Sequence, residues 1–149
     1  MSESTSSLRV SEIMSRDLVE ARGNEPLSEA VTRMLEKDVG SILVIENGEI
    51  QGIITKGDVL KKAFLYGLEA REVSCKRVMS SPAKTIEEDA SIETAAKLMG
   101  KENISKLPVV KEGKLVGIVT STDIIRAEPI QVSYLQELVR ARYVPHERT

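Results

Sequence analysis

The chain has 149 residues, of which 41% are hydrophobic, and its 21 basic and 23 acidic side chains give a formal net charge of −2. This composition is typical of a folded protein with a buried core and excludes a disordered chain. Because the charges are interspersed and only 3% of residues are aromatic, the sequence has neither the basic stripe nor the stacking platforms that nucleic-acid binding usually needs.

The first elements predicted along the chain are a short strand and a helix. An extended piece over residues 18–20 leads to Asn24, a residue type that often caps the N-terminus of a helix. Apolar side chains then recur at helical spacing, which predicts one buried face made of Leu27, Ala30, Val31, Met34 and Leu35. We therefore expect this helix to pack on one side only.

Two strands and a second helix follow. The runs over residues 41–46 and 49–55 are rich in Val and Ile, and they are separated by Asn47 and Gly48, a strong two-residue signal for a β-hairpin. A helix that begins at Thr55 is predicted to carry the apolar residues Val59, Leu60, Ala63 and Phe64. The first half of the chain thus predicts the order strand, helix, strand, strand, helix.

The same order recurs at an offset of 65 residues, without a gap. The offset pairs several identical residues: Met14 with Met79, Ser15 with Ser80, Gly52 with Gly117, Thr55 with Thr120 and Asp58 with Asp123. We therefore expect two repeats, residues 8–66 and 73–131, followed by a tail of residues 132–149.

The second repeat predicts matching elements. A strand is expected over residues 83–86, and Asp89 takes the place of Asn24 as a helix cap. The matching helical face consists of Ile92, Ala95, Ala96, Met99 and Gly100. A hairpin with strands over residues 107–111 and 114–120 follows, and Pro129 is expected to end the last helix early.

A Thr-x-x-Asp motif opens the last helix of each repeat, at residues 55–58 and 120–123. One interpretation is a capping box, in which the Thr hydroxyl and the Asp carboxylate each accept a hydrogen bond from a backbone N–H of the other residue. The other is a ligand site, because free N–H groups at a helix start attract phosphate and a carboxylate suits the diol of a ribose. Gly52 and Gly117, inside the preceding strands, indicate that something approaches the backbone closely.

These tandem Gly-hydrophobic-hydrophobic-Thr-x-x-Asp motifs, each after a hydrophobic hairpin, resemble those of the cystathionine-beta-synthase (CBS) domain pair, also called a Bateman module. The resemblance covers residues 8–131 without insertions. It implies an α+β fold of two tandem β-α-β-β-α repeats, packed sheet to sheet about a pseudo-twofold axis. It also implies two clefts that hold adenosyl compounds, namely AMP, ADP, ATP or S-adenosylmethionine.

The resemblance assigns roles to residues of both repeats. Asp58 and Asp123 would accept hydrogen bonds from ribose hydroxyls, and Thr55 and Thr120 would contact ribose or phosphate. The adenine pocket of the first repeat would be lined by Leu18, Val19, Ser41, Ile42 and Leu43. The matching positions of the second repeat are Ala83, Lys84, Thr85, Lys106, Leu107 and Pro108. The first repeat departs from the family pattern, since Leu43 stands where the family and the second repeat have Pro.

Phosphate groups of a bound nucleotide would meet further side chains within and after the motifs. These are Lys56 in the first repeat and Ser121, Thr122 and Arg126 in the second. The alternative for each basic residue is a place on a solvated surface. Because it offers three hydroxyl groups and Arg126, the second repeat is expected to be the better site.

Three functions compete. The first is a regulatory module that binds an adenine nucleotide as a regulatory ligand, forms a homodimer and signals to a separate protein target. The second is a structural or oligomerisation module whose Thr-x-x-Asp motifs are only helix caps. The third, an enzyme, is not expected, because the chain lacks a recognisable set of nucleophile, base and orienting residue. No catalytic cofactor is expected either.

The remaining conspicuous residues predict little chemistry. One cysteine, Cys75, and one histidine, His146, are too few for a Cys/His metal site. Cys75 matches Val10 under the offset, which favours a small buried hydrophobic role. The N-terminal segment lacks the apolar stretch of a signal peptide or membrane span, so a cytoplasmic protein is expected. Residues 133–143 predict a C-terminal helix that covers the module or joins two subunits.

Overall fold

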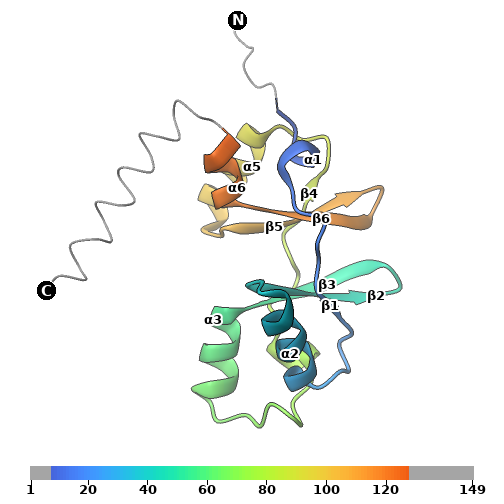
Figure 1. Ribbon diagram of the computed structural model, residues 1–149, viewed down its shortest axis with the longest axis vertical. Helices are drawn as coiled ribbons and strands as arrows, with labels where there is room; N and C mark the ends of the chain where they lie inside the picture. The colour runs from blue at the N-terminus through green and yellow to red at the C-terminus, as the bar shows by residue number, and fades with distance from the viewer. Residues whose placement is uncertain (1–7, 128–149) are drawn as a thin grey trace, which may run out of the picture.

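A computed structural model of the protein describes residues 8–127, which form two similar halves (Figure 1). Each half has a three-stranded sheet, in the order β1-β2-β3 in one and β4-β5-β6 in the other. In both sheets the first strand pairs parallel with the second, and the second pairs antiparallel with the third. The predicted order of strand, helix, strand, strand, helix is therefore confirmed in both repeats.

The strands of the two sheets are β1 (Glu20–Ala21), β2 (Ser41–Glu46), β3 (Glu49–Thr55), β4 (Ile86–Glu87), β5 (Lys106–Lys111) and β6 (Lys114–Thr120). The helices of the first half are α2 (Leu27–Lys37), α3 (Lys56–Asp58) and the π-helical segment η2 (Val59–Phe64). Those of the second half are α5 (Ile92–Glu102) and α6 (Ser121–Ala127). A short helix lies at the start of each repeat, α1 (Val10–Ile13) in the first and α4 (Cys75–Val78) in the second.

The two sheets face each other at the centre of the molecule, with the helices on the outside. Figure 1 shows α2 and α3 on the outer side of the first sheet and α5 and α6 on the outer side of the second. Strands β3 and β6 are in contact across this interface. The arrangement agrees with the predicted sheet-to-sheet packing, and it places any cleft shared by the two repeats beside these strands.

Tight turns join the hairpin strands in both halves, as the sequence predicts. Asn47 and Gly48 have φ angles of 56° and 80°, and Glu112 and Gly113 have φ angles of 52° and 80°. Two successive residues with positive φ form the turn whose twist matches that of the flanking strands. Each hairpin ends in a Thr-x-x-Asp motif, so the turn fixes the register that delivers the motif to the sheet interface.

The long helix of each half packs on its sheet through a face narrower than predicted. Leu27, Ala30 and Met34 are buried in the first half, but Leu35 is 72% exposed. The reason is that a position eight residues along a helix has rotated by about 80° from the first. In the second half the buried residues are Ile92, Ala95 and Met99, whereas Ala96 and Gly100 are exposed.

The predicted helix caps Asn24 and Asp89 are wrong. Helix α2 begins after Pro26, and its first N–H groups donate to the carbonyl oxygens of residues 73 and 70 at 2.9 and 2.8 Å. These backbone partners satisfy the helix start without a side-chain cap. Helix α5 begins after Ser91, whose hydroxyl accepts a hydrogen bond from the Thr94 N–H at 3.1 Å.

The short helix at the start of each repeat packs on the other half of the molecule. Val10 of α1 is fully buried in the core of the second half, and its N–H donates to the Ala90 carbonyl at 2.8 Å. In the same way Cys75 of α4 is buried in the core of the first half, and its N–H donates to the Glu25 carbonyl at 2.9 Å. Each repeat therefore supplies a residue to the core of the other repeat. Matching the two repeats in the sequence did not predict this exchange.

The chain that leaves each short helix crosses the sheet of the other half at the strand glycine. Ser15 pairs with Ile118 and Ser80 with Ile53. A Cβ atom added at Gly117 would lie 2.9 Å from the Ser15 carbonyl oxygen, and one at Gly52 would lie 2.7 Å from the Ser80 oxygen. The close approach predicted at both glycines is confirmed, and the approaching group is the crossing polypeptide.

Several predictions fall outside the described residues, namely Pro129, His146 and the helix expected over residues 133–143. Within residues 8–127, no helix has the length and apolar character needed to cross a membrane. The same residues contain no group of three or more His, Cys, Asp or Glu side chains that could hold a metal ion.

Candidate functional site

The first Thr-x-x-Asp motif forms a capping box at the junction of β3 and α3. The Thr55 N–H donates to Asp58 Oδ2 at 2.9 Å, and the Asp58 N–H donates to Thr55 Oγ1 at 3.2 Å. These bonds satisfy N–H groups that a helix start leaves without intrahelical partners. The capping interpretation is therefore confirmed for this motif, and it occupies one carboxylate oxygen of Asp58.

The second motif has the same geometry where β6 meets α6. The Thr120 N–H donates to Asp123 Oδ2 at 2.9 Å, and the Asp123 N–H donates to Thr120 Oγ1 at 3.1 Å. Capping and ligand binding do not exclude each other, because a carboxylate has two oxygens and about four acceptor positions. In each motif the cap uses Oδ2 and leaves Oδ1 for another partner.

The second carboxylate oxygen has different partners in the two repeats. Asp58 Oδ1 accepts a hydrogen bond from Ser80 Oγ at 3.1 Å and lies 3.5 Å from Lys62 Nζ. Among residues 8–127, Asp123 Oδ1 has no side-chain hydrogen bond or ion pair. The carboxylate of the second motif is thus the one with a free acceptor in the described part of the chain.

A cavity of about 240 Å³ adjoins the second motif. The first repeat contributes Leu18, Val19, Ser41 and Leu43 to its lining, and the second contributes Lys106, Thr120 and Asp123. The lining therefore combines an apolar wall with a few polar groups, the usual composition of small-molecule sites. Its volume is slightly below the roughly 300–1,000 Å³ typical of sites for drug-sized ligands.

The cavity brings together predicted site residues from both repeats. The adenine positions of the first repeat lie beside Thr120 and Asp123 of the second. The cause is the crossing segment, because Ser15 is bridged to Ile118 of β6 and the chain then returns to the first sheet, where the Val19 carbonyl accepts a hydrogen bond from the Leu43 N–H at 2.9 Å. The Ser80 hydroxyl, at the matching place in the second repeat, reaches Asp58 of the first. Each candidate site is thus built from both repeats.

Some predicted adenine positions lie away from the sheet interface. Ile42 and Leu107 are fully buried in the cores of their own halves, because alternate side chains of a strand point to opposite faces. Pro108, whose side chain points to the opposite face from Leu107, is also fully buried but does not line the cavity. Lys84 is exposed and lies 4.0 Å from Glu102, while Ala83 and Thr85 are partly buried on the segment that follows Ser80.

The predicted phosphate partners are dispersed. Thr122 and Arg126 are exposed on α6, and the partly buried Ser121 donates its N–H to the Ser105 carbonyl at 2.9 Å. Lys56 and Lys106 instead converge from different repeats, since both side chains lie within 3.8 Å of a Cβ position built at Gly40. Gly40 and Lys106 both line the cavity, so positive charge gathers beside it.

Other cavity residues were not among the predicted site residues. Ser15, Asp17, Val39, Gly40 and Ile118 line it together with the predicted ones. Ser15 could have been identified from the sequence as a candidate site residue, because the repeat offset pairs it with an identical residue, Ser80. Asp17 is paired with Lys37 at 2.9 Å, which balances its negative charge. Nothing in the sequence marks the remaining residues as site residues, and they line the cavity because of tertiary packing.

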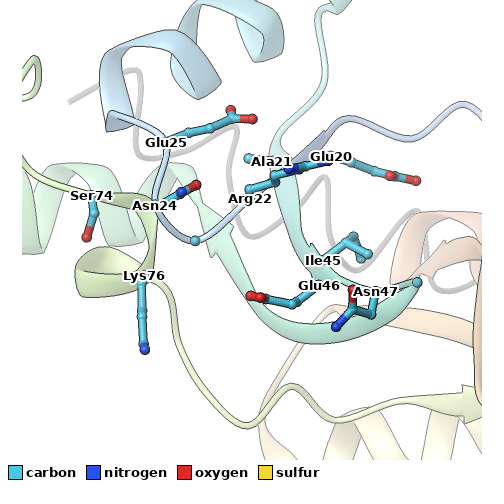
Figure 2. Close-up of a pocket in the computed structure, with 12 residues that line it drawn as sticks. Glu20, Ala21, Arg22, Asn24, Glu25, Ile45, Glu46, Asn47, Ser74 and Lys76 are labelled. Atoms are coloured by element: carbon cyan, nitrogen blue, oxygen red, sulfur yellow. The ribbon is translucent and has the colours of Figure 1, made fainter.

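A larger cleft, of about 830 Å³, lies at the other end of the first sheet. Figure 2 shows that its lining comes from the end of β1, the β2–β3 hairpin and the segment around α4, with Glu20 and Lys76 pointing in different directions. Glu25, also in the lining, is paired with Arg33. None of the predicted ligand residues lines this cleft, and its charged side chains do not converge, so the smaller cavity is the better candidate.

Cys75 belongs to the core and not to a site. Its side chain is fully buried, and burial, with a smaller contribution from the negative charge of Glu25, raises the pKa of the thiol to about 11. A thiol with a raised pKa is a poor nucleophile near neutral pH, because the thiolate is the reactive form. The predicted role as a small buried hydrophobic residue is confirmed.

Comparison with known protein families gives two matches along the chain. The family model described as the CBS domain matches residues 10–64 and residues 75–129. These two matches coincide with the two halves whose motifs and sheets are described above.

Individual proteins are similar over most of the chain. An uncharacterised protein of Methanopyrus kandleri is 38% identical over 133 residues, which are 88% of this chain and 68% of that protein. An uncharacterised protein of Methanocaldococcus jannaschii is 40% identical over 120 residues, which are 80% of this chain and 62% of that protein. This chain thus spans about two thirds of the length of these curated relatives.

A solved structure shares the arrangement of both repeats. It is the CBS domain pair of protein MJ0100 in complex with 5′-methylthioadenosine and S-adenosyl-L-methionine, with a TM-score of 0.74 and 29% sequence identity. The similarity covers 83% of this chain and 98% of that one.

Proposed function

This chain belongs to the CBS domain family as a tandem pair, and from this premise we propose that it is a regulatory module that binds one class of small molecule, phosphorylated adenosyl compounds, between its repeats. The cavity at the second motif carries the proposal. It brings apolar Leu18 and Val19 from one repeat together with Thr120 and Asp123 from the other. Chemical groups suited to a base and a ribose therefore lie side by side.

The lining suggests how such a ligand would be held. The apolar wall suits the adenine ring, which gains from removal of its faces from water. Asp123 Oδ1 can accept hydrogen bonds from the ribose diol, because a carboxylate is acceptor-only and charge-assisted bonds are the strong ones. The proposed ribose ligand is therefore the oxygen that the cap does not use.

Two lysines favour a phosphorylated ligand over S-adenosylmethionine. Lys56 and Lys106 lie beside Gly40 at the cavity, and Lys37 balances the charge of nearby Asp17. Ammonium groups attract phosphate oxygens and repel a positively charged sulfonium. The MJ0100 complex supports an adenosyl ligand in general, and we propose AMP, ADP or ATP for this chain.

Calorimetric titration of the purified protein with AMP, ADP, ATP, S-adenosylmethionine and 5′-methylthioadenosine tests the proposal. One adenine nucleotide should bind, and Asp123→Asn should weaken its binding about 10- to 150-fold, since hydrogen bonds to charged groups contribute about 1.5–3 kcal/mol. Asp89→Asn, at an exposed position away from the cavity, is the control and should bind like the wild type. Absence of binding by all five compounds would refute the proposal.

The competing function is a structural module whose motifs are only helix caps. The hydrogen bonds of both capping boxes favour it, because they account for the Thr and Asp residues without a ligand. The free oxygen of Asp123 and the adjoining cavity are not needed by a cap. In either case we propose that the output passes to a separate protein target and that the chain is not itself an enzyme.

An exposed apolar surface on the first half supports a homodimer. Leu60, Phe64, Leu65 and Tyr66, at and after η2, are between 63% and 79% exposed. Clustered apolar residues of this kind are typical of protein interfaces. We propose that this surface joins two copies of the chain, so that Phe64→Glu should lower the mass measured by light scattering. An unchanged mass in this variant would count against the interface.

A further inference from the structure

The two motif aspartates offer a comparison within one chain. Both use Oδ2 to cap a helix, but Asp58 Oδ1 already has Ser80 Oγ at 3.1 Å and Lys62 Nζ at 3.5 Å. The Asp58 side chain is only 14% exposed. Among residues 8–127, Oδ1 of Asp123 lacks such partners, and Asp123 lines a cavity. The position that would receive a ribose is therefore occupied by protein groups in one repeat and open in the other.

A sequence difference accounts for the lysine in this contrast, whereas the serine differs only in geometry, because the Ser15 hydroxyl accepts a hydrogen bond from the Asp17 N–H at 3.2 Å. Ser80 has an identical counterpart, Ser15, whereas Lys62 corresponds to Ala127 under the offset of 65 residues. Besides Asp58, the Lys62 ammonium reaches the Val78 carbonyl oxygen at 3.1 Å. Lys62 thus ties the aspartate to the crossing segment of the other repeat. An alanine at the matching position can form neither bond.

We propose that Lys62 closes the first site, so that each chain binds a single adenosyl ligand, at Asp123. This inference rests on the proposed function. It adds the number of ligands that each chain binds and the residue that determines this number. A ribose at Asp58 would have to displace both the Ser80 hydroxyl and the Lys62 ammonium. Removing one partner from a partly buried ion pair leaves the other charge poorly compensated, which disfavours the exchange. At Asp123 a ligand would have no such partner to displace among residues 8–127.

A different role for Lys62 makes the opposite prediction. If its ammonium bound a ligand phosphate at the first site, Lys62→Ala would weaken binding there. If it closes the site, the same substitution should create binding. Because Ala127 is the natural counterpart, Lys62→Ala gives the first repeat the side chain of the second, and Ala127→Lys does the reverse. The two substitutions form a reciprocal exchange at one matched position.

The test is calorimetric titration of the full chain with AMP, ADP and ATP, reading the number of ligands bound. We expect one ligand per chain for the wild type, two for Lys62→Ala, and a loss of affinity of at least tenfold for Ala127→Lys. Asp58→Asn should leave wild-type binding unchanged, whereas Asp123→Asn should weaken it. Lys61→Ala, at the exposed neighbouring position, is the matched control and should behave as the wild type.

The outcomes separate this inference from the proposed function. Two ligands per wild-type chain, with one lost in Asp58→Asn, would keep the function and overturn the closure of the first site. A count that stays at one in Lys62→Ala would also overturn it, as would weaker binding. Lys62→Met retains the aliphatic stem and repeats the test if the alanine variant does not fold. No binding by any variant would overturn the function, and the inference with it.

Discussion

The two halves of the molecule have the same backbone plan but differ at the motif aspartate. Both form a hairpin with two positive φ angles, a strand glycine crossed by the other repeat and a Thr-x-x-Asp capping box. Only in the first half does a lysine, Lys62, bind the second oxygen of the aspartate. The residues that hold the backbone are thus repeated, whereas the side chains around the motif aspartate differ, and we propose that this difference decides which half has room for a ligand.

Substitution of the strand glycines should produce the largest effect and should affect both halves alike. A Cβ at Gly117 would lie 2.5 Å from Met14 Sδ and 2.9 Å from the Ser15 carbonyl oxygen. Because the backbone oxygen cannot move without shifting the crossing segment, we expect Gly117→Ala to lower the free energy of unfolding by about 1–3 kcal/mol. Gly52→Ala should do the same, and urea unfolding measures both.

An exposed glycine inside a helix provides the control for this pair. Gly100 has no atom near its Cβ position, so Gly100→Ala in α5 should be neutral or stabilise the protein slightly. A small effect of Gly117→Ala, similar to that of Gly100→Ala, would show that the crossing segment is not held against β6. Unequal losses at Gly52 and Gly117 would show that the two crossings differ in rigidity.

Replacement of Lys106 by serine, the residue at the matching position of the first half, tests a second difference between the halves. The offset pairs Lys106 with Ser41, and both residues line the cavity, but Lys106 brings a positive charge to it and Ser41 does not. We expect Lys106→Ser to weaken AMP binding about tenfold, because a bond to a charged group contributes at least about 1.5 kcal/mol. Binding of 5′-methylthioadenosine, which has no phosphate, should not change. Equal loss for both compounds would place Lys106 beside the base or ribose.

Much of the fold could be predicted from the sequence, because repetition and local chemistry specify it. The hairpin turn at Asn47 and Gly48 and the capping boxes depend on neighbours within a few residues. The predicted start of α2 is wrong, because this helix uses carbonyl groups more than 40 residues away instead of a side-chain cap. Helix α5 does have a side-chain cap, but it is Ser91 and not the predicted Asp89. A distant backbone partner leaves no trace in the local sequence.

Many residues of the candidate site were predicted, but not which of them lie together in the structure. The offset matches Leu18 with Ala83 and Asp58 with Asp123, which groups Leu18 with Asp58 of the same repeat in one of the two clefts. The structure instead places Leu18 beside Asp123. The deciding feature is α1, a four-residue helix that packs on the other half and is too short to give a periodic pattern.

Loss of the capping hydroxyl should have a smaller effect, equal in the two halves. Thr55→Val and Thr120→Val keep the shape of the side chain but remove the acceptor for the Asp58 and Asp123 N–H groups. We expect each to lower the free energy of unfolding by about 1 kcal/mol. A greater loss of unfolding free energy in Thr55→Val than in Thr120→Val would indicate that the cap also supports the Asp58–Lys62 ion pair. Thermal unfolding of the two variants in parallel gives the comparison.

The smallest effect should come from Cys75, which takes in the first core the place that Val10 takes in the second. Near neutral pH, Cys75→Val should change the free energy of unfolding by less than about 1.5 kcal/mol, since both side chains are small and apolar. The pH dependence is more informative. Burial raises the thiol pKa from 9.0 to about 11, so between these values the unfolded chain releases a proton that the folded chain retains.

Stability should therefore be complete below pH 9 and should fall as the pH rises toward 11, because the folded state binds more protons in that window. Unfolding by urea at several pH values from 8 to 11 should show this loss for the wild type and a smaller one for Cys75→Val. Identical slopes would mean that the thiol reaches water in the folded protein. Since α4 carries Cys75 into the core of the other repeat, such a result would count against the tight packing of this helix on the first half.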